Sequence, residues 1–497
     1  MEKIIAERIA QLAGVALTPE LEKRLIELVG SAKEGHFCHP IEDPTSIPVA
    51  LWEEGGENPF SKKPLVVQGN RLYLQRNWAL ETLILQKVKE LLARLPTESP
   101  DRFRGELVKQ ANLLNAQRKA LLNGFEKMFT LFTGGPGTGK TFTASCFIRL
   151  LAASRDKQLK VAIAAPTGKA AAHLESALRG QGPLEGKLKC ESTTLHRLLK
   201  LQPGMQRLRS EWTIDADLVV VDEASMLDGA LLLHLLNAIG PQTRLLLLGD
   251  PDQLPPVEGG GLFAELSDLF GQKLEQSIRM GTGGLLEFSQ AIRSGSIQPC
   301  DAVTWLEKKE PEEWVDWLVE RLPNPICSSE PLQPEEQKSF RVLCALRQGP
   351  FGSDVLNEKL LARFEKKFAP GQWLMVPIMI VQNNPKQQLF NGTTGVLVRH
   401  QHQAYAYFEE GRQIPESELP HYEIAFCLSV HKSQGSEYEE VVLLFPPGSE
   451  NFGREALYTG VTRAKKKVSI AVDGLTLENL LKGISRKRSG FTERFKA

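Results

Sequence analysis

The sequence predicts an α/β protein with two sets of parallel strands, because short apolar runs alternate with helical segments in two separate parts of the chain. Such alternation is typical of parallel sheets that carry helices on both faces. The runs of the first set are Phe129–Thr133, Val161–Ala165, Leu218–Val221 and Arg244–Leu248. The second set begins at Arg341–Ala345 and ends with Val441–Phe445 and Val468–Val472. Sheets of this kind bind ligands at the carboxyl ends of their strands, so functional residues are expected directly after these runs.

A chain of 497 residues is too long for one compact core, and about three domains are expected. We expect a mainly helical domain over residues 1–106, the first α/β domain over 107–272 and the second over 273–497. The second domain contains a Gly/Gln/Asn-rich β insertion at about 371–421. Its predicted strands are Leu374–Val381, Gly395–Val398 and Ala404–Phe408.

Smaller elements follow from local patterns. Leu65–Val67 and Leu72–Leu74 flank a polar turn and predict a hairpin, and a helix is expected over Trp78–Leu95. Ahead of the second strand set, an acidic, Pro-punctuated segment carries three tryptophans that we expect on short helices facing the core. They are Trp305, Trp314 and Trp317.

Composition excludes several classes of protein. Sixty basic residues balance sixty acidic ones, so no global field favours nucleic acid, although a local groove could still hold a single strand. Seven scattered cysteines without C-x-x-C spacing argue against a disulfide framework, a zinc ribbon and an iron–sulfur cluster. We interpret the close spacing of His36, Cys38 and His39 as coincidence rather than as a metal site. Without a signal-peptide pattern or a membrane-length apolar run, a cytoplasmic protein is expected.

A phosphate-binding loop follows the first predicted strand. The segment matches G-x-x-x-x-G-K-[ST] and is followed by a predicted helix over Phe142–Leu151. Backbone N–H groups of such a loop surround a triphosphate, Lys140 reaches the β- and γ-phosphates, and the Thr141 hydroxyl is a ligand of Mg²⁺. The alternative is a Gly-rich turn that binds nothing. The loop consists of Gly134, Gly135, Pro136, Gly137, Thr138, Gly139, Lys140 and Thr141.

Further candidates for nucleotide chemistry follow later strands. Asp222 after Leu218–Val221 suits a Mg²⁺ ligand, and Glu223 suits a group that orients or deprotonates water. Gln253 lies in a Pro-rich loop after the next run, and its amide could bond both water and a γ-phosphate. Hydrolysis also needs positive charge at the γ-phosphate. Arg279 and Arg463 are the candidates, but among sixty Lys and Arg residues only the resemblance described next singles them out.

A series of segments then points to a family. In order they read GGPGTGKT, APTGKAA, TTLHRLL, VDEASM, GDPDQLPPVEGG, LEQSIR, SVHKSQGSEY and LYTGVTRAKKK. This series resembles the motifs of superfamily 1 helicases, and its wording is similar to that of the RecD family, the alpha subunits of exodeoxyribonuclease V. Segments at Gly35–Cys38, Arg71–Arg76 and Arg341–Asn357 resemble the same family, so the similarity covers nearly the whole chain. It implies two RecA-like P-loop motor domains with ATP and Mg²⁺ between them, and an SH3-like β insertion.

The resemblance also implies roles for single residues. Arg279 and Arg463 would be arginine fingers, Gln117 would read the adenine, and Glu437 would contact the ribose. The alternative for Gln117 is an ordinary helix glutamine. Loops that bind phosphates without reading sequence would hold single-stranded DNA. Their residues are Pro166, Thr167, Gly168, Thr194, His196, His431, Lys432, Ser433 and Gln434.

The expected function is therefore an ATP-dependent 5′→3′ DNA helicase subunit that acts on duplex ends together with RecB- and RecC-type partners. The insertion departs from the family pattern, because Thr393 stands where the family carries an acidic residue. No carboxylate cluster resembles a nuclease centre, so a nuclease is expected on a partner chain. The alternatives are a stand-alone helicase and an ATP-gated scaffold subunit.

Overall fold

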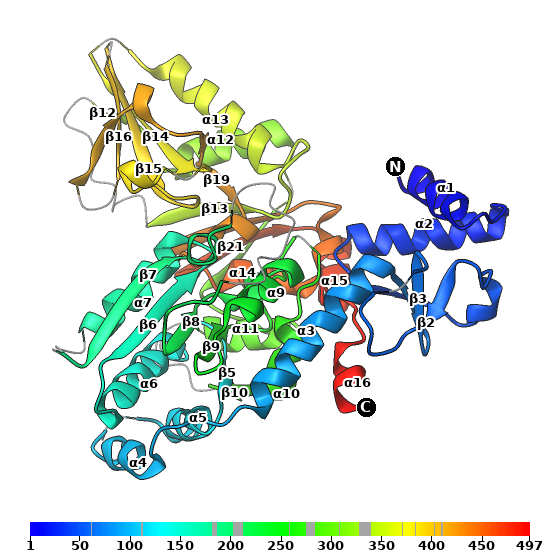
Figure 1. Cartoon of the computed structure of the whole chain (residues 1–497). Helices are drawn as coiled ribbons and strands as arrows, with labels where there is room; N and C mark the ends of the chain where they lie inside the picture. Colours follow the sequence, from blue (N-terminus) through cyan, green and yellow to red (C-terminus); the bar gives the residue numbers. More distant parts are fainter. Residues whose placement is uncertain are drawn as a thin grey trace.

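The computed structural model describes residues 1–60, 62–110, 113–180, 186–201, 212–257, 259–274, 284–307, 309–327, 339–369, 371–382, 384–401, 403–408 and 411–497. Within these ranges the chain forms four β-sheets with helices packed around them (Figure 1). Two of these sheets are entirely parallel and form the centres of two lobes, as the α/β prediction required.

The first lobe is built on a six-stranded parallel sheet. Its strand order is β10 (Gly271–Lys273), β5 (Phe129–Thr133), β9 (Arg244–Gly249), β8 (Leu218–Val221), β6 (Leu159–Ala165) and β7 (Leu188–Thr194). The four predicted strands of this set are confirmed, whereas β7 and β10 at the two edges were not predicted. The domain boundary predicted at residue 272 stays a prediction, and β10 extends the first sheet to Lys273.

Alternate residues of these strands face opposite layers of helices. Leu131, Val219 and Leu247 pack with α3 (Gln75–Ala93), α9 (Gly229–Ala238) and α10 (Phe263–Phe270). Phe132, Val220 and Leu248 pack on the other face with α4 (Pro100–Val108), α5 (Asn115–Phe125), α6 (Lys140–Ser154) and α7 (Gly168–Gly180). A strand buried on both faces must be apolar throughout, which explains the unbroken hydrophobic runs in the sequence.

The second lobe has a five-stranded parallel sheet. Its order is β11 (Val303–Leu306), β21 (Ala464–Val472), β20 (Tyr438–Phe445), β13 (Phe340–Cys344) and β19 (Cys427–Ser429). One face packs against α11 (Leu285–Arg293), α14 (Gly453–Val461) and α15 (Gly474–Lys482). The other face packs against α12 (Pro311–Arg321) and α13 (Ser353–Lys367).

One tryptophan departs from its predicted place. Trp314 and Trp317 lie on α12, as expected, but Trp305 lies on β11 and is 44% exposed. The prediction was wrong for Trp305 because β11 pairs along the edge of the sheet with β21, more than 150 residues later in the chain, and local sequence carries no sign of that pairing.

The β insertion is a separate antiparallel sheet. Its order is β12 (Ile326–Cys327), β14 (Trp373–Ile380), β15 (Thr394–His400), β16 (Gln403–Tyr407) and β17 (Gln413–Pro415), and β18 (Tyr422–Ile424) pairs with β14. The three predicted strands are β14, β15 and β16. The insertion lies beside α12 and α13 at the far end of the second lobe (Figure 1).

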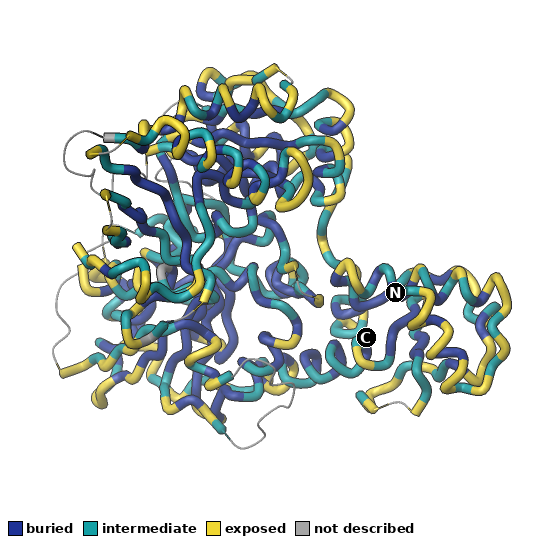
Figure 2. Tube along the Cα trace, turned by 90° about the horizontal axis from the view of Figure 1, so that it is seen from above, coloured by how far each residue is buried: buried dark blue, intermediate teal, exposed yellow. Residues whose placement is uncertain are grey.

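The N-terminal region combines α1 (Glu2–Leu12), α2 (Pro19–Lys33) and α3 with a small sheet. The sheet order is β1 (Cys38–Pro40), β4 (Arg71–Leu74), β3 (Leu65–Gln68) and β2 (Trp52–Glu54). The predicted hairpin is β3–β4. Figure 2 shows this region projecting from the lobes with its own buried interior, and both chain termini lie there. None of the described helices has the length and apolar character that a membrane span requires.

The last residues of the chain join all three parts. We call residues 483–496, which end in α16 (Phe491–Lys496), the C-terminal strap. Ser485 N–H donates to Glu455 Oε2 of α14 (2.9 Å), and Arg486 pairs with Asp268 of α10 (3.0 Å). Further on, Arg488 N–H donates to His36 Nδ1 (2.9 Å), so the strap reaches the N-terminal region.

Arg494 of the strap makes a buried ion pair that anchors α16. Its Nη1 lies 2.9 Å from Glu81 Oε1, whose side chain is fully buried, and its guanidinium stacks over Trp78. Removal of one partner leaves a buried charge unpaired, so we expect Arg494→Ala to destabilise the protein by about 3–5 kcal/mol. Thermal unfolding measures this effect. As a control, Lys482→Ala removes an exposed pair with Glu478 and should cost about 0–1 kcal/mol; equal losses would contradict the anchoring role.

His36 makes the strap contact sensitive to pH. Burial, reinforced by the charge of Arg488, lowers the pKa of His36 to about 4. The unfolded imidazole titrates near ~6.5, so this group adds stability above that pH, and the stability is lost as the pH falls from about 6.5 toward 4. We expect the unfolding temperature to fall over this window. His36→Asn should reduce the slope; an unchanged slope in this variant would remove the assignment.

Candidate nucleotide site and nucleic-acid interface

The phosphate loop connects β5 to α6. Gly137 and Gly139 have φ angles of 73° and 79°, a left-handed conformation that favours glycine. Lys140 Nζ donates to the carbonyl oxygens of Gly134 (2.8 Å) and Gly135 (2.9 Å), so the lysine folds back over its own loop. These two carbonyls hold the ammonium group where a triphosphate would replace them as the acceptor.

Asp222 and Glu223 lie at the carboxyl end of β8. Asp222 is 8% exposed, and burial, followed by the charge of Glu223, raises its pKa to about 7, while Lys140 opposes this shift. Glu223 N–H donates to Asp222 Oδ1 (2.8 Å), and Glu223 has a left-handed φ of 52°. A buried carboxylate and a hydroxyl are oxygen donors of the kind that Mg²⁺ prefers, so Asp222, and Thr141 at the start of α6, are the residues that would hold it.

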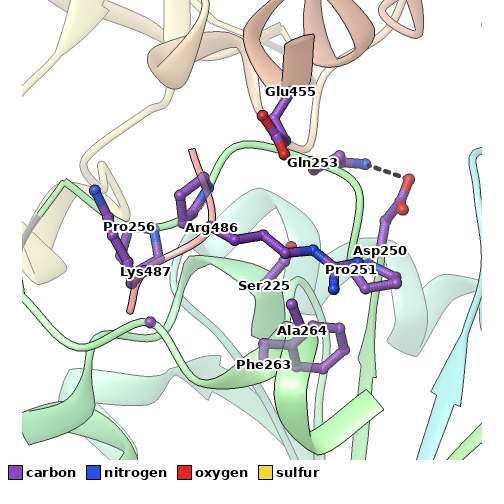
Figure 3. Close-up of a pocket in the computed structure, with 12 residues that line it drawn as sticks. Ser225, Asp250, Pro251, Gln253, Pro256, Phe263, Ala264, Glu455, Arg486 and Lys487 are labelled. Atoms are coloured by element: carbon purple, nitrogen blue, oxygen red, sulfur yellow. Dashed lines mark hydrogen bonds between the residues drawn. The ribbon is translucent and has the colours of Figure 1, made fainter. Parts of the chain in front are cut away.

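Gln253 lies in the loop after β9. Its side chain is 6% exposed, and its Nε2 donates to Asp250 Oδ2 (3.3 Å), the contact drawn in Figure 3. Its Oε1 is buried without a hydrogen-bond partner. Buried polar atoms normally have partners, and an orphaned amide oxygen next to a phosphate loop fits a missing water or ligand.

Gln117 has a similar orphaned atom. It is 1% exposed, and its Oε1 accepts the Leu114 N–H (3.0 Å) at the start of α5, while its Nε2 is buried without a partner. The available group is therefore an N–H donor, as recognition of adenine by a ring nitrogen requires. This observation favours the nucleotide role over an ordinary helix glutamine.

A cleft of about 340 Å³ lies beside the phosphate loop, between the two lobes. The first lobe contributes the loop and β10, and the second lobe contributes α11 and α14. Charged and polar side chains in its wall include Asp252, Asp268, Lys273, Arg293, Tyr458 and Arg486. Asp252 pairs across the cleft with Arg293 (2.6 Å) and lies 3.8 Å from Arg486 of the strap. Local sequence gives no signal that Arg293 or Arg486 belongs to this cleft.

Of the two predicted arginine fingers, the structure describes Arg463 but not Arg279, which lies outside the described residues. Arg463 is 3% exposed, and its guanidinium donates to Thr459 O (3.1 Å), Ser436 O (3.3 Å) and Thr462 Oγ1 (3.3 Å), all within its own lobe. Contact with a γ-phosphate therefore requires exchange of these bonds, and the finger role of Arg463 stays a prediction.

The ribose residue and the first set of strand-binding residues lie at strand ends. Glu437 precedes β20 and lies 3.7 Å from Lys465 Nζ. Residues 166–168 follow β6, and Thr194 ends β7, where its hydroxyl accepts the Arg197 N–H and caps the short helix α8 (Leu195–Leu198), which carries His196. Phe390 of the β insertion packs over Gly168, a contact that sequence patterns did not reveal.

In the second set, residues 431–434, the side chains form ion pairs and hydrogen bonds with other residues of this chain. Lys432 pairs with Glu423, Ser433 Oγ donates to Val430 O (2.7 Å), and Gln434 Nε2 donates to Leu254 O (3.1 Å). Burial lowers the pKa of His431 to about 4, so the imidazole is neutral at pH 7. Ser433 and Gln434 are buried, so the structure uses their side chains to fix the loop.

The histidines of residues 36–39 form hydrogen bonds with residues outside this segment, not with each other. His36 Nδ1 accepts from the strap, and His39 Nδ1 lies 2.8 Å from the Ser31 hydroxyl. Among the residues that the structure describes, no group of three or more His, Cys, Asp or Glu side chains is arranged to hold a metal ion.

One parallel sheet presents the phosphate loop, the Asp222 carboxylate and the Gln253 loop at one edge, and helices α11 and α14 of the second lobe close the cleft beside the phosphate loop. This architecture defines a two-lobed P-loop motor of superfamily 1. In agreement, a family model described as an AAA domain matches residues 117–259, and one described as a UvrD-like helicase C-terminal domain matches residues 424–471.

Curated relatives narrow the class. The RecBCD enzyme subunit RecD of Mycolicibacterium smegmatis is 33% identical over 87% of this chain and 83% of its own length. The ATP-dependent RecD2 DNA helicase of Deinococcus radiodurans is 28% identical over 85% of this chain and 58% of its own length. A Pif1 helicase from Bacteroides, solved with ADP-AlF3 and ssDNA, aligns with a TM-score of 0.45 and 17% identity over 74% of this chain and 94% of that chain. The chain belongs to the RecD family.

The orphaned Gln117 amide gives a prediction about base selectivity. Gln117→Ala removes a donor for adenine, and one lost hydrogen bond costs about 0.5–1.5 kcal/mol, so KM for ATP should rise about 2- to 12-fold. At ring position N1 adenine has an acceptor and guanine an N–H donor, so KM for GTP should change little when the Gln117 amide faces N1, whereas N7 is an acceptor in both bases. Steady-state hydrolysis of both nucleotides measures this difference. Lys119→Ala, on the exposed side of α5, is the control; equal changes for ATP and GTP would contradict recognition through N1.

Proposed function

We propose that the chain is the ATP-dependent 5′→3′ DNA motor of a RecBCD-type helicase–nuclease that processes duplex ends in recombinational repair in the cytoplasm. The observation that carries the proposal is the interlobe cleft, which is lined by the phosphate loop, by Pro251 and Asp252 of the Gln253 loop, and by α11 and α14 of the second lobe. Lys140 bonds to the same phosphate loop, and its charge acts on Asp222. A nucleotide bound there touches both lobes, so its hydrolysis changes how they sit on a strand.

Each residue of the site has a separate task in this proposal. The loop amides and Lys140 bind the phosphates, and Glu223 orients the attacking water or takes its proton. Gln253 senses the γ-phosphate, and Arg279 and Arg463 offset the charge that develops there. Mg²⁺, held by Thr141 and Asp222, would neutralise phosphate charge when bound.

The strand is proposed to run across the carboxyl edges of both sheets, over residues 166–168, 194–196 and 431–434. Residues 166–168 and 194–196 offer short polar groups, which bind phosphates without reading sequence. Residues 432–434 would have to exchange their internal bonds to contact a strand. The balanced net charge fits such local contacts better than a broad basic surface.

The N-terminal region is proposed to dock RecB- and RecC-type subunits. The named relatives are subunits of the RecBCD enzyme. In this chain the projecting region exposes large apolar side chains, among them Ile4, Leu12, Val49 and Phe60, each at least 67% exposed. Exposed apolar side chains gathered on one region mark surfaces that bind other proteins.

Substitution of the catalytic cations tests the motor. Lys140→Gln should abolish ATP hydrolysis while partner binding persists, because the lysine touches only its own loop. Arg463→Ala should lower DNA-stimulated turnover by about 10³–10⁵, as arginine fingers do in related phosphoryl transfer. The assay is DNA-stimulated ATPase of the chain co-purified with its partners, with unwinding of 5′- and 3′-tailed duplexes.

Two controls sharpen this test. Arg463→Lys keeps the positive charge and should retain more activity than Arg463→Ala. Near-normal turnover in Lys140→Gln would remove the site assignment. Unwinding of a 5′-tailed duplex by the isolated chain would instead favour a stand-alone helicase.

A further inference from the structure

Tyr458 of α14 lies between the two lobes, although no nucleotide role was expected for it. Its side chain is 2% exposed, and its hydroxyl donates to Asp250 Oδ2 of the first lobe (2.9 Å). The same hydroxyl lies 3.0 Å from the position that a Cβ on Gly135 would occupy. One phenol therefore contacts both the phosphate loop and the loop that carries Gln253.

The acceptor of this bond also holds Gln253. Asp250 is 1% exposed, and its Oδ2 accepts both the Tyr458 hydroxyl and Gln253 Nε2, while its Oδ1 accepts the Asp252 N–H (3.1 Å). With its nitrogen anchored in this way, the Gln253 side chain has a fixed rotamer and its oxygen is the atom left for a ligand. The orientation of Gln253 thus depends on a carboxylate that the second lobe holds.

Thr459, the residue after Tyr458, also connects the two lobes. Thr459 Oγ1 accepts the Leu254 N–H (2.9 Å), and Thr459 O accepts Arg463 Nε (3.1 Å). From the other side, Gln434 Nε2 donates to Leu254 O. A single turn of α14 therefore joins the Gln253 loop of one lobe to Arg463 of the other.

We propose that Tyr458 and Thr459 are positioning residues for ATP hydrolysis: they fix Gln253 through Asp250 and Leu254 and tie it to Arg463. This inference deepens the proposed function and rests on it. Movement of the second lobe shifts Tyr458, Thr459 and Arg463 together relative to Asp250 and Leu254, so the contacts that orient the glutamine and the approach of the guanidinium to the γ-phosphate change in one step. Hydrolysis then occurs only when the lobes have the right separation, which is how a strand bound across them can control it.

Tyr458→Phe is the direct test, because it removes the donor and keeps the ring. We expect kcat for DNA-stimulated hydrolysis to fall about tenfold, equivalent to about 1.4 kcal/mol of barrier, with KM for ATP unchanged. A merely structural residue would not separate kcat from KM in this way. Tyr73→Phe, which removes another buried phenol from a buried carboxylate, Glu81, is the matched control and should keep normal kcat. Thr459→Val supplies a second variant with the same expected loss of kcat.

A double-mutant cycle completes the test. In an Asp250→Asn background, Tyr458→Phe should cost little further kcat, because both changes break one contact. Normal kcat in Tyr458→Phe and Thr459→Val, or the same loss with and without Asp250→Asn, overturns the positioning role. The proposed function itself would be refuted by a different result, namely that the chain shows no ATP hydrolysis that the Lys140→Gln substitution abolishes. The two failures are therefore distinguishable.

Discussion

The structure depends on one constraint: parallel strands end at the same edge of their sheet, and this edge of the first sheet borders the cleft that α11 and α14 of the second lobe close. In the first sheet, this constraint alone gathers the phosphate loop after β5, Asp222 after β8 and the Gln253 loop after β9. These segments are separated by up to about a hundred residues in the chain, yet adjacent strands bring them together. The strands must be apolar on both faces to be covered by helices, so chemistry is confined to the edge.

The second lobe contributes contacts rather than a loop of its own. Tyr458 and Thr459 bond the first lobe, Arg293 pairs with Asp252, and the strap carries Arg486 into the same cleft. Figure 3 shows Arg486 reaching across α10 toward the Asp250–Pro256 loop. Because the strap then continues to Glu81 of the N-terminal region, the nucleotide cleft and the region proposed to bind partners are joined by a continuous set of polar contacts.

Sequence predicted the interior of this molecule better than its connections. The buried strands β5, β6, β8 and β9 were found because burial on both faces makes a strand uniformly apolar, and the phosphate loop was found because its backbone demands glycines at fixed positions. Edge strands such as β11, and with it the position of Trp305, were missed because their pairing partners lie far away in the chain. The same reason hid Tyr458 and Arg486, whose partners lie more than 200 residues away, and Arg293, whose partner Asp252 lies outside its own helix and loop. The internal bonds of Arg463 and Gln434 were equally invisible, although both residues had been selected for contacts with ligands.

The central claim is that one triphosphate is held by both lobes at once. It is tested most directly by a structure of the chain with Mg²⁺, a non-hydrolysable ATP analogue and single-stranded DNA. The account predicts that Lys140 leaves the carbonyls of Gly134 and Gly135 for the phosphates, while Gln253 and Arg463 reach the γ-phosphate from opposite sides. A nucleotide bound only by the first lobe, with Arg463 still on Thr459 and Ser436, would contradict it.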